Sequence, residues 1–185
     1  MMKRGFTLLE LLISITVSFI VITAIVNFLI VGSRSYQSLN QRIDLQRNAR
    51  LVSDRLIREI KRASSIDPFS DGSSIIINYY VYTLQANIIS SSLSTVRYYV
   101  NPLGILRRQV KQGNLWVGDN PLTENNFRVL TPVFYYLDAS SNQTSPNLAK
   151  IVLVDLKLDA NRDNQADYTL SFSIYLPLKE NYFLR

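Results

Sequence analysis

The chain has 185 residues and a formal net charge of +6, and it contains neither cysteine nor histidine. This length allows one ordinary domain. The missing residue types exclude disulfides, thiolate metal sites and histidine general bases, and with them most hydrolase mechanisms. No carboxylate pair stands out as a catalytic cluster, so the composition indicates a protein that is not an enzyme.

The first residues combine charge, glycine and apolar residues in an unusual order. Lys3 and Arg4 precede Gly5, and a single carboxylate, Glu10, adjoins an uncharged apolar run over residues 11–31. As a helix with ~1.5 Å rise per residue, this run covers the ~30 Å hydrocarbon thickness of a bilayer. An unpaired carboxylate costs roughly 2.5–3.5 kcal/mol at mid-bilayer and less near the interface. We therefore expect Glu10 to meet a countercharge.

The segment KRGFTLLE, residues 3–10, resembles the processing site of type IV prepilins and type II secretion pseudopilins. The resemblance implies that residues 1–5 form a leader peptide, which a prepilin peptidase removes by cutting after Gly5. The new N-terminal residue, Phe6, would be N-methylated. Glu10 would pair with the N-terminal amine of a neighbouring subunit in a filament. The alternative is an uncut signal anchor with an accidental glutamate.

The apolar run also predicts where the chain is located. A secretory signal peptide has a shorter apolar region, about 7–15 residues, and residues 31–33 are only a weak cleavage site. Lys3 and Arg4 place the N-terminus in the cytoplasm by the positive-inside rule. We expect a single-pass protein of the cytoplasmic (inner) membrane. After assembly it would lie in a pilus or pseudopilus at the cell surface or in the periplasm.

A long helix is predicted from Phe6 to about Ser65. Residues 6–33 form its membrane-spanning, filament-core half and residues 34–65 its amphipathic half. Apolar residues of the second half recur in steps of three and four: Leu45, Ala49, Val52, Leu56, Ile60 and Ala63. Three charge pairs have i,i+4 spacing: Arg50–Asp54, Asp54–Arg58 and Arg55–Glu59. Gly32 and Ser33 predict a bend or loosened turn, and Pro68 ends the pattern.

Residues 66–185 predict an antiparallel β domain. Strands are expected over residues 75–83, 95–100, 105–110, 134–138, 150–159 and 168–176. Turn signals at residues 101–104 and a polar link at residues 160–167 predict two hairpins. The Ser/Asn-rich residues 90–94 and 139–145 are expected to be loops. The fold class is α+β, with the long N-terminal helix packed on an antiparallel β-sheet in a pilin-like arrangement.

Similarity to one subclass extends beyond the N-terminus. Residues 48–60, 96–100 and 104–108 are similar to minor pilins and the larger minor pseudopilins, the PilW-like and J-type class. Major pilins usually have a helix-bending proline and many pilins a C-terminal disulfide loop, and this chain has neither.

The resemblance implies a structural subunit of a type IV pilus (fimbrium), a competence pilus or a type II secretion pseudopilus, in its tip or initiation complex. The partners would be other pilin or pseudopilin subunits, the prepilin peptidase/methyltransferase, the inner-membrane assembly platform, and membrane lipid before assembly. The sequence leaves open which filament system it serves.

One polar segment has the spacing of a calcium loop. Oxygen ligands alternate as in the first nine places of an EF-hand-like loop: Asp159, Asn161, Asp163, the Gln165 backbone carbonyl and Asp167. Asn164 replaces the usual glycine, and Leu170 stands where a bidentate glutamate is expected. The competing interpretation is a plain hairpin loop, because turns favour Asp and Asn.

Basic residues suggest a second binding function. Arg107, Arg108 and Lys111 lie near Trp116 in the sequence. Clustered cations neutralise phosphates, as a DNA-binding minor pilin in natural transformation would require. The alternative is that the basic residues form solvated flanks and subunit contacts.

Overall fold

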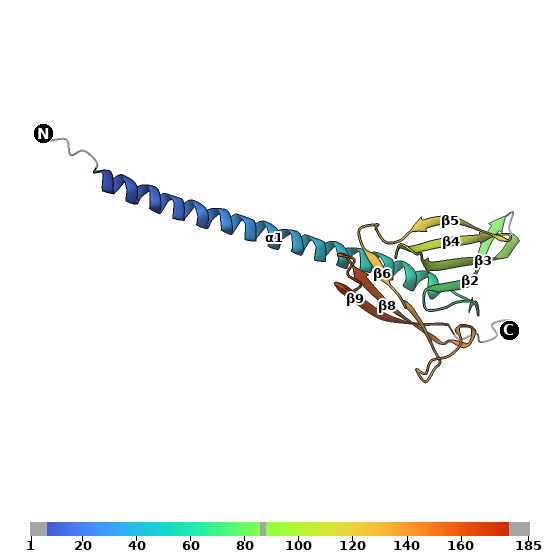
Figure 1. The fold of residues 1–185 in the computed structure, drawn as a ribbon. Coiled ribbons are helices and arrows are strands. Elements are labelled where there is room, and N and C mark those ends of the chain that lie inside the picture. Colours follow the sequence, from blue (N-terminus) through green and yellow to red (C-terminus); the bar gives the residue numbers. More distant parts are fainter. Residues whose placement is uncertain (1–6, 86–87, 178–185) are drawn as a thin grey trace. The chain divides into compact units, whose positions relative to one another are not determined.

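The computed structural model describes residues 7–85 and 88–177. These residues form one long helix, α1 (Leu8–Ile60), nine strands and a short 3₁₀ helix, η1 (Pro146–Leu148) (Figure 1). The chain divides into two compact units, Met1–Ile43 and Asp44–Arg185. The last turns of α1 therefore fold together with the strands.

The helix α1 is continuous through residues 32–35. The loosened turn predicted at Gly32 is therefore wrong, because one helical glycine costs only about 1 kcal/mol relative to alanine. The helix ends at Ile60, earlier than predicted. The Ala63 N–H bonds to the Ile60 carbonyl at 3.0 Å in a tighter turn, and the Ser64 N–H then bonds to the Asn78 carbonyl at 2.7 Å. The chain thus leaves the helix directly into a sheet.

The first sheet has five antiparallel strands, which follow one another in chain order. They are β1 (Ser65–Ile66), β2 (Ser74–Gln85), β3 (Ile88–Val100), β4 (Leu106–Gln112) and β5 (Leu115–Pro121). Strands predicted over residues 75–83, 95–100 and 105–110 are confirmed, but the loop predicted over residues 90–94 is wrong. Ser90 pairs with Thr83 and Ser91 with Tyr82, because β2 supplies backbone partners whatever the side chains are.

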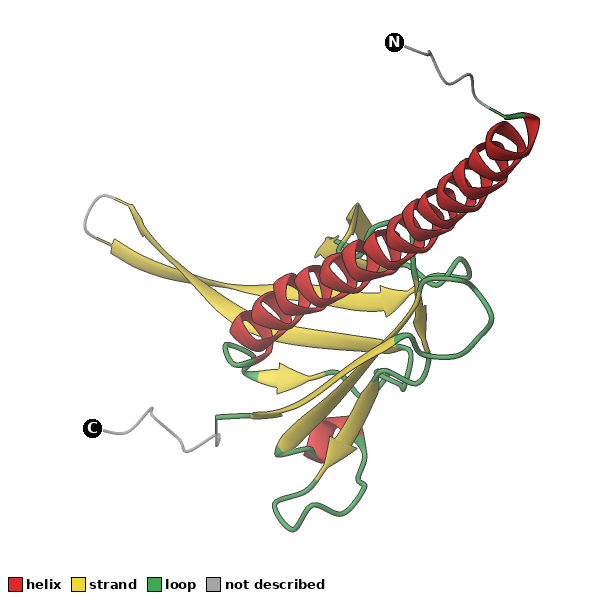
Figure 2. Ribbon diagram, turned by 90° about the vertical axis from the view of Figure 1, so that its left-hand side faces the viewer, coloured by secondary structure: helices red, strands yellow, loops and turns green. Residues whose placement is uncertain are grey.

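The strands β2 and β3 extend beyond their neighbours. Pairing with β1 stops at Asn78, and pairing with β4 stops at Val96. Figure 2 shows the two strands continuing as a twisted two-stranded ribbon. We call residues 79–85 and 88–95 the β2–β3 ribbon.

The second sheet has four strands around a central one, β8 (Ile151–Asp159). The strands β6 (Arg128–Leu130) and β7 (Phe134–Leu137) pair with different parts of β8, and β9 (Tyr168–Tyr175) also pairs with it. The predicted strands and the closing hairpin are confirmed. The sequence did not predict β6 or the division of the strands into two sheets.

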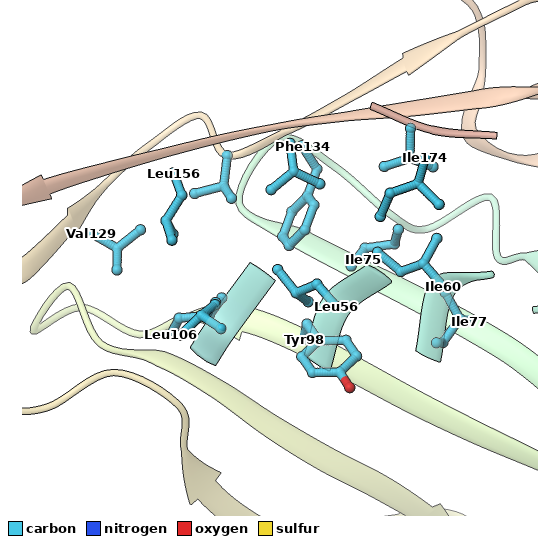
Figure 3. Packing of buried hydrophobic residues seen from close by; sticks show 14 of the residues in the cluster. Leu56, Ile60, Ile75, Ile77, Tyr98, Leu106, Val129, Phe134, Leu156 and Ile174 are labelled. Carbon is cyan, nitrogen blue, oxygen red and sulfur yellow. The ribbon is translucent and has the colours of Figure 1, made fainter. Parts of the chain in front are cut away.

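The core joins α1 to both sheets within the second unit. The predicted stripe is confirmed for Leu45, Ala49, Val52, Leu56 and Ile60, each at most 2% exposed. Figure 3 shows Leu56 and Ile60 among side chains of the first sheet, such as Ile75, and of the second, such as Phe134. Burying one such aliphatic side chain stabilises the fold by about 1.5–3 kcal/mol. This end of α1 therefore covers apolar residues of two sheets at once.

Candidate functional site

The first half of α1 carries apolar side chains that the chain does not cover. Every residue from 7 to 44 is exposed, and Phe19 and Phe28 are 73% and 77% exposed. Within the described residues, α1 is the one helix long and apolar enough to cross a membrane. Apolar area gains about 25 cal/mol per Å² when it leaves water. This half therefore requires a cover from lipid or from other proteins.

Four hydroxyl groups in the most apolar part of this half make their hydrogen bonds inside the helix. Ser14, Thr16, Ser18 and Thr23 each donate to the carbonyl oxygen four residues earlier at 2.8 Å. An unpaired hydroxyl is costly in an apolar medium. These internal bonds leave a helix surface suited to hydrocarbon or to another apolar helix.

Glu10 is the charged group at the start of α1. Its carboxylate accepts the Thr7 backbone N–H and the Thr7 hydroxyl, both at 3.1 Å. The Thr7 hydroxyl oxygen in turn accepts the Glu10 backbone N–H at 3.3 Å. This reciprocal pair is a capping box, and the helix macrodipole also favours an anion here. The fold therefore holds the carboxylate at the first turn.

Comparison with known proteins matches this same end of the chain. Residues 1–26 match the family model for the prokaryotic N-terminal methylation motif. The chain carries the N-terminal methylation motif of the type IV pilin and pseudopilin family. Searches of curated proteins and of solved structures give no match.

The pilin motif has direct consequences for processing and assembly. It implies cleavage by a prepilin peptidase and assembly with other pilins, and it belongs to structural proteins rather than enzymes. With the apolar helix, it is consistent with an inner-membrane prepilin that later enters a pilus. The matched range contains Gly5, Phe6 and Glu10. In the structure, Glu10 lies in the first turn of α1, where it forms the capping box with Thr7. Gly5 and Phe6 lie outside the described residues.

The candidate calcium loop is built around Asp159. This side chain is fully buried, and its carboxylate accepts the backbone N–H groups of Arg162 at 2.6 Å and Asn164 at 2.9 Å. Arg162 and Asn164 have φ values of 64° and 65°. Asparagine tolerates this left-handed region better than most residues. Asn164 thus takes the conformation for which a calcium loop usually has glycine.

The three other predicted side-chain ligands of calcium also accept hydrogen bonds from the loop's own backbone. Asn161 accepts the Asp163 N–H at 3.1 Å, Asp163 accepts the Gln165 N–H at 2.7 Å, and Asp167 accepts the Ala160 N–H at 2.8 Å. Over the part of the chain that the structure describes, no three acidic residues form a metal-binding group. Oxygen donors suit calcium, but calcium binding here stays a prediction.

Of the three cations predicted to contact DNA, Arg108 forms an ion pair with a residue of α1. Its guanidinium bonds to the Glu59 carboxylate at 3.1 Å, and Glu59 also pairs with Arg55 at 3.3 Å, as its i,i+4 spacing predicted. Burial opposes charge on Arg108, but the Glu59 carboxylate and the Tyr98 hydroxyl together outweigh this effect and raise the pKa of Arg108. Burial, followed by the Glu59 carboxylate, raises the pKa of Tyr98 well above its usual value. Arg108 therefore connects the first sheet to α1.

The remaining cations of this region lie on the first sheet. Arg107 forms an ion pair with Asp119, whereas Lys111 is exposed. Arg97, which the sequence did not single out, lies over the Trp116 ring, 4.7 Å from its centroid. Such stacking contributes about 0.5–1 kcal/mol at exposed sites. Cation–aromatic spacing across β3 and β5 depends on strand register, so no local signal could have predicted it.

Proposed function

We propose that the chain is a minor pilin or pseudopilin, a structural subunit of a type IV pilus, a competence pilus or a type II secretion pseudopilus. A prepilin peptidase cuts after Gly5, Phe6 is N-methylated, and the mature chain leaves the inner membrane for a filament. The exposed apolar half of α1, most of which lies inside the matched methylation motif, carries this proposal.

Assembly moves the apolar half of α1 from the membrane into a filament, and the preference for the filament needs a physical cause. Lipid tails are as apolar as leucine side chains, so apolar area alone gives little preference for a filament over a membrane. Glu10 differs between the two environments, because a carboxylate gains most from a cation where the dielectric constant is low. Its pairing with the amine of Phe6 in a neighbouring subunit would favour the filament and fix the register of the helices.

The minor class is supported by two features. The helix runs from Leu8 to Ile60 without proline, and the similarity to the PilW-like and J-type class covers part of its second half. We place the subunit in the tip or initiation complex, in contact with the assembly platform. Neighbouring genes would separate the filament systems: a retraction ATPase indicates a pilus, an outer-membrane channel indicates secretion, and a DNA-translocation protein indicates competence.

The assembly role is tested by Glu10→Ala. We expect normal cleavage but little incorporation, measured as mature chain in sheared filaments and by mass spectrometry of its N-terminus. Asp54→Ala is the matched control, because Asp54 is an exposed carboxylate on the same helix. Wild-type incorporation of the Glu10 variant would show that its carboxylate is dispensable.

The tip position is tested with a single label. The chain has no cysteine, so Ser140→Cys places one thiol at an exposed position of the β domain. We expect maleimide-gold at one end of each filament. Label along the whole shaft would contradict the tip assignment.

The alternative function is a DNA-binding minor pilin. Two of its three proposed contacts, Arg107 and Arg108, are ion-paired in the structure, which weakens it. Duplex DNA binding that falls steeply with salt would support this alternative.

A further inference from the structure

One of the contacts between the two sheets lies at the turn between β3 and β4. The Val129 N–H of β6 donates to the carbonyl oxygen of Gly104, in the turn between β3 and β4, at 2.6 Å. Gly104 has a φ of 78°, and a Cβ there would lie 2.9 Å from the Cβ of Arg128. The glycine therefore allows the turn to lie directly against the stem of Arg128. This contact fixes the position of the Arg128 backbone and Cβ relative to the turn.

A groove of about 590 Å³ opens beside this contact. Arg107, Arg128 and Arg162 line it together with Pro102 and Leu103, and no carboxylate does so among the described residues. An adjoining hollow of about 850 Å³ shares Arg128 and Pro102 with it. The groove thus combines apolar walls with positive charge.

Among the residues that the structure describes, two of the three arginines in the groove lack a carboxylate partner. Arg107 is paired with Asp119, but neither Arg128 nor Arg162 forms an ion pair within the described residues.

Within ranges 7–85 and 88–177, each of these two guanidinium groups makes one hydrogen bond, and its acceptor is neutral. Arg128 donates to the side-chain oxygen of Asn164 at 3.1 Å, and Arg162 donates to the backbone oxygen of Asn125 at 3.3 Å. A guanidinium has several further N–H donors. These bonds therefore orient the groups and leave most donors available for a ligand.

We propose that this groove binds a carboxylate-bearing peptide segment of a neighbouring filament subunit, with Arg128 and Arg162 as its ligands. The planar guanidinium fork fits a carboxylate with two parallel hydrogen bonds. Pro102 and Leu103 provide apolar contacts for the residues beside that carboxylate. The inference rests on the proposed function, because the filament supplies the neighbouring subunit.

The number of free charges favours a peptide over DNA. Two cations that neutralise two phosphates give a salt slope of roughly −1.8, whereas strong DNA binders make about 6–10 phosphate contacts. Two acidic side chains, in contrast, saturate both guanidinium groups of the groove. A short acidic segment therefore fits the groove better than a nucleic acid does.

The test measures binding by the full-length chain, purified in detergent. The probe is a fluorescent octapeptide with two adjacent glutamates among alanines, compared with its glutamine counterpart and with a short DNA duplex. We expect the glutamate peptide to bind and the glutamine peptide to bind much more weakly. Arg128→Gln and Arg162→Gln should each weaken binding about tenfold. Arg128→Lys should also weaken it, because the charge remains but the fork is lost.

Arg50→Gln, an exposed arginine on α1, is the matched control and should bind as the wild type does. Thermal unfolding of each variant shows whether the fold is kept. Equal binding by folded Arg128→Gln, or preference for the duplex, would overturn the inference. A chain that binds the peptide but is never cleaved at Gly5 would overturn the proposed function instead, so the two failures are distinguishable.

Discussion

The two halves of α1 treat their apolar side chains in opposite ways, although they belong to one helix. Residues 7–44 are all exposed, whereas Leu45, Leu56 and Ile60 are at most 1% exposed. Composition already separates them: residues 11–31 carry no charge, whereas in residues 45–60 an apolar stripe lies among charged residues. The second half packs on two sheets that the same chain encodes. The first half has to be covered by lipid or by other proteins. Each prediction below tests one side of this contrast.

The largest effect concerns the first half, where Gly5→Val should block cleavage. A β-branched side chain occupies space at the scissile bond that glycine leaves empty, so mass spectrometry should find the uncut precursor in the membrane. Gly32→Ala is the matched control, because a Cβ there meets no atom within 4 Å. It should be processed as the wild type is. Normal processing of Gly5→Val would refute the cleavage assignment.

In the second half, Leu56→Ala should destabilise the fold by about 2–5 kcal/mol, because it leaves a cavity between α1 and the sheets. Leu51, on the same helix, is 61% exposed, and Leu51→Ala should change stability by less than about 0.5 kcal/mol. Urea unfolding of the full chain in detergent measures both. Equal effects would show that the two faces of this helix segment do not differ as described.

The helix and its buried stripe could be predicted because helical periodicity is a local property. Leu45 to Ile60 repeat within a few turns, and the pattern identifies the buried face without knowledge of what covers it. The β2–β3 ribbon could not be predicted in this way. Ser90 and Ser91 become strand because β2 lies beside them, and the choice between one sheet and two depends on pairings distant in sequence.

The functional residues follow the same rule: those defined by nearby residues could be predicted, and those defined by distant partners could not. Glu10 could be found because motif and helix start lie together, and the Thr7-x-x-Glu10 spacing of a capping box was also readable in the sequence, although it was missed. Arg108 could not be assigned correctly from its neighbours. Its partner Glu59 is 49 residues away, and only the packing of β4 against α1 brings the two together.

Calcium should have a moderate effect on the second unit. With a dissociation constant near 1 mM, as in weak extracellular sites, 5 mM calcium would stabilise the fold by about 1 kcal/mol. This corresponds to a rise in Tm of about 2–4 °C relative to a chelator control. Asp163→Asn should abolish the rise. An unchanged Tm in the wild-type chain would leave the plain hairpin loop and show that this loop needs no external partner.

The smallest effect is the acid sensitivity contributed by Asp71, just before β2. Its carboxylate accepts the Ser73 hydroxyl at 2.8 Å and the backbone N–H groups of Ser73 at 2.7 Å and Ser74 at 2.6 Å. Burial opposes the charge, but these hydrogen bonds together lower the pKa of Asp71. The unfolded chain therefore binds more protons in this range, so the contribution is present above about pH 4 and is lost as the pH falls through the folded-state pKa.

Asp71→Asn should consequently lower Tm at pH 7, while the difference from the wild type shrinks toward pH 3. Asp54→Asn, an exposed carboxylate on α1, should not show this convergence. A constant gap between Asp71→Asn and the wild type over this range would mean that the ionised carboxylate does not stabilise the turn. Because Asp71 lies in the second unit, its titration should alter unfolding of the β domain and leave the apolar half of α1 unaffected.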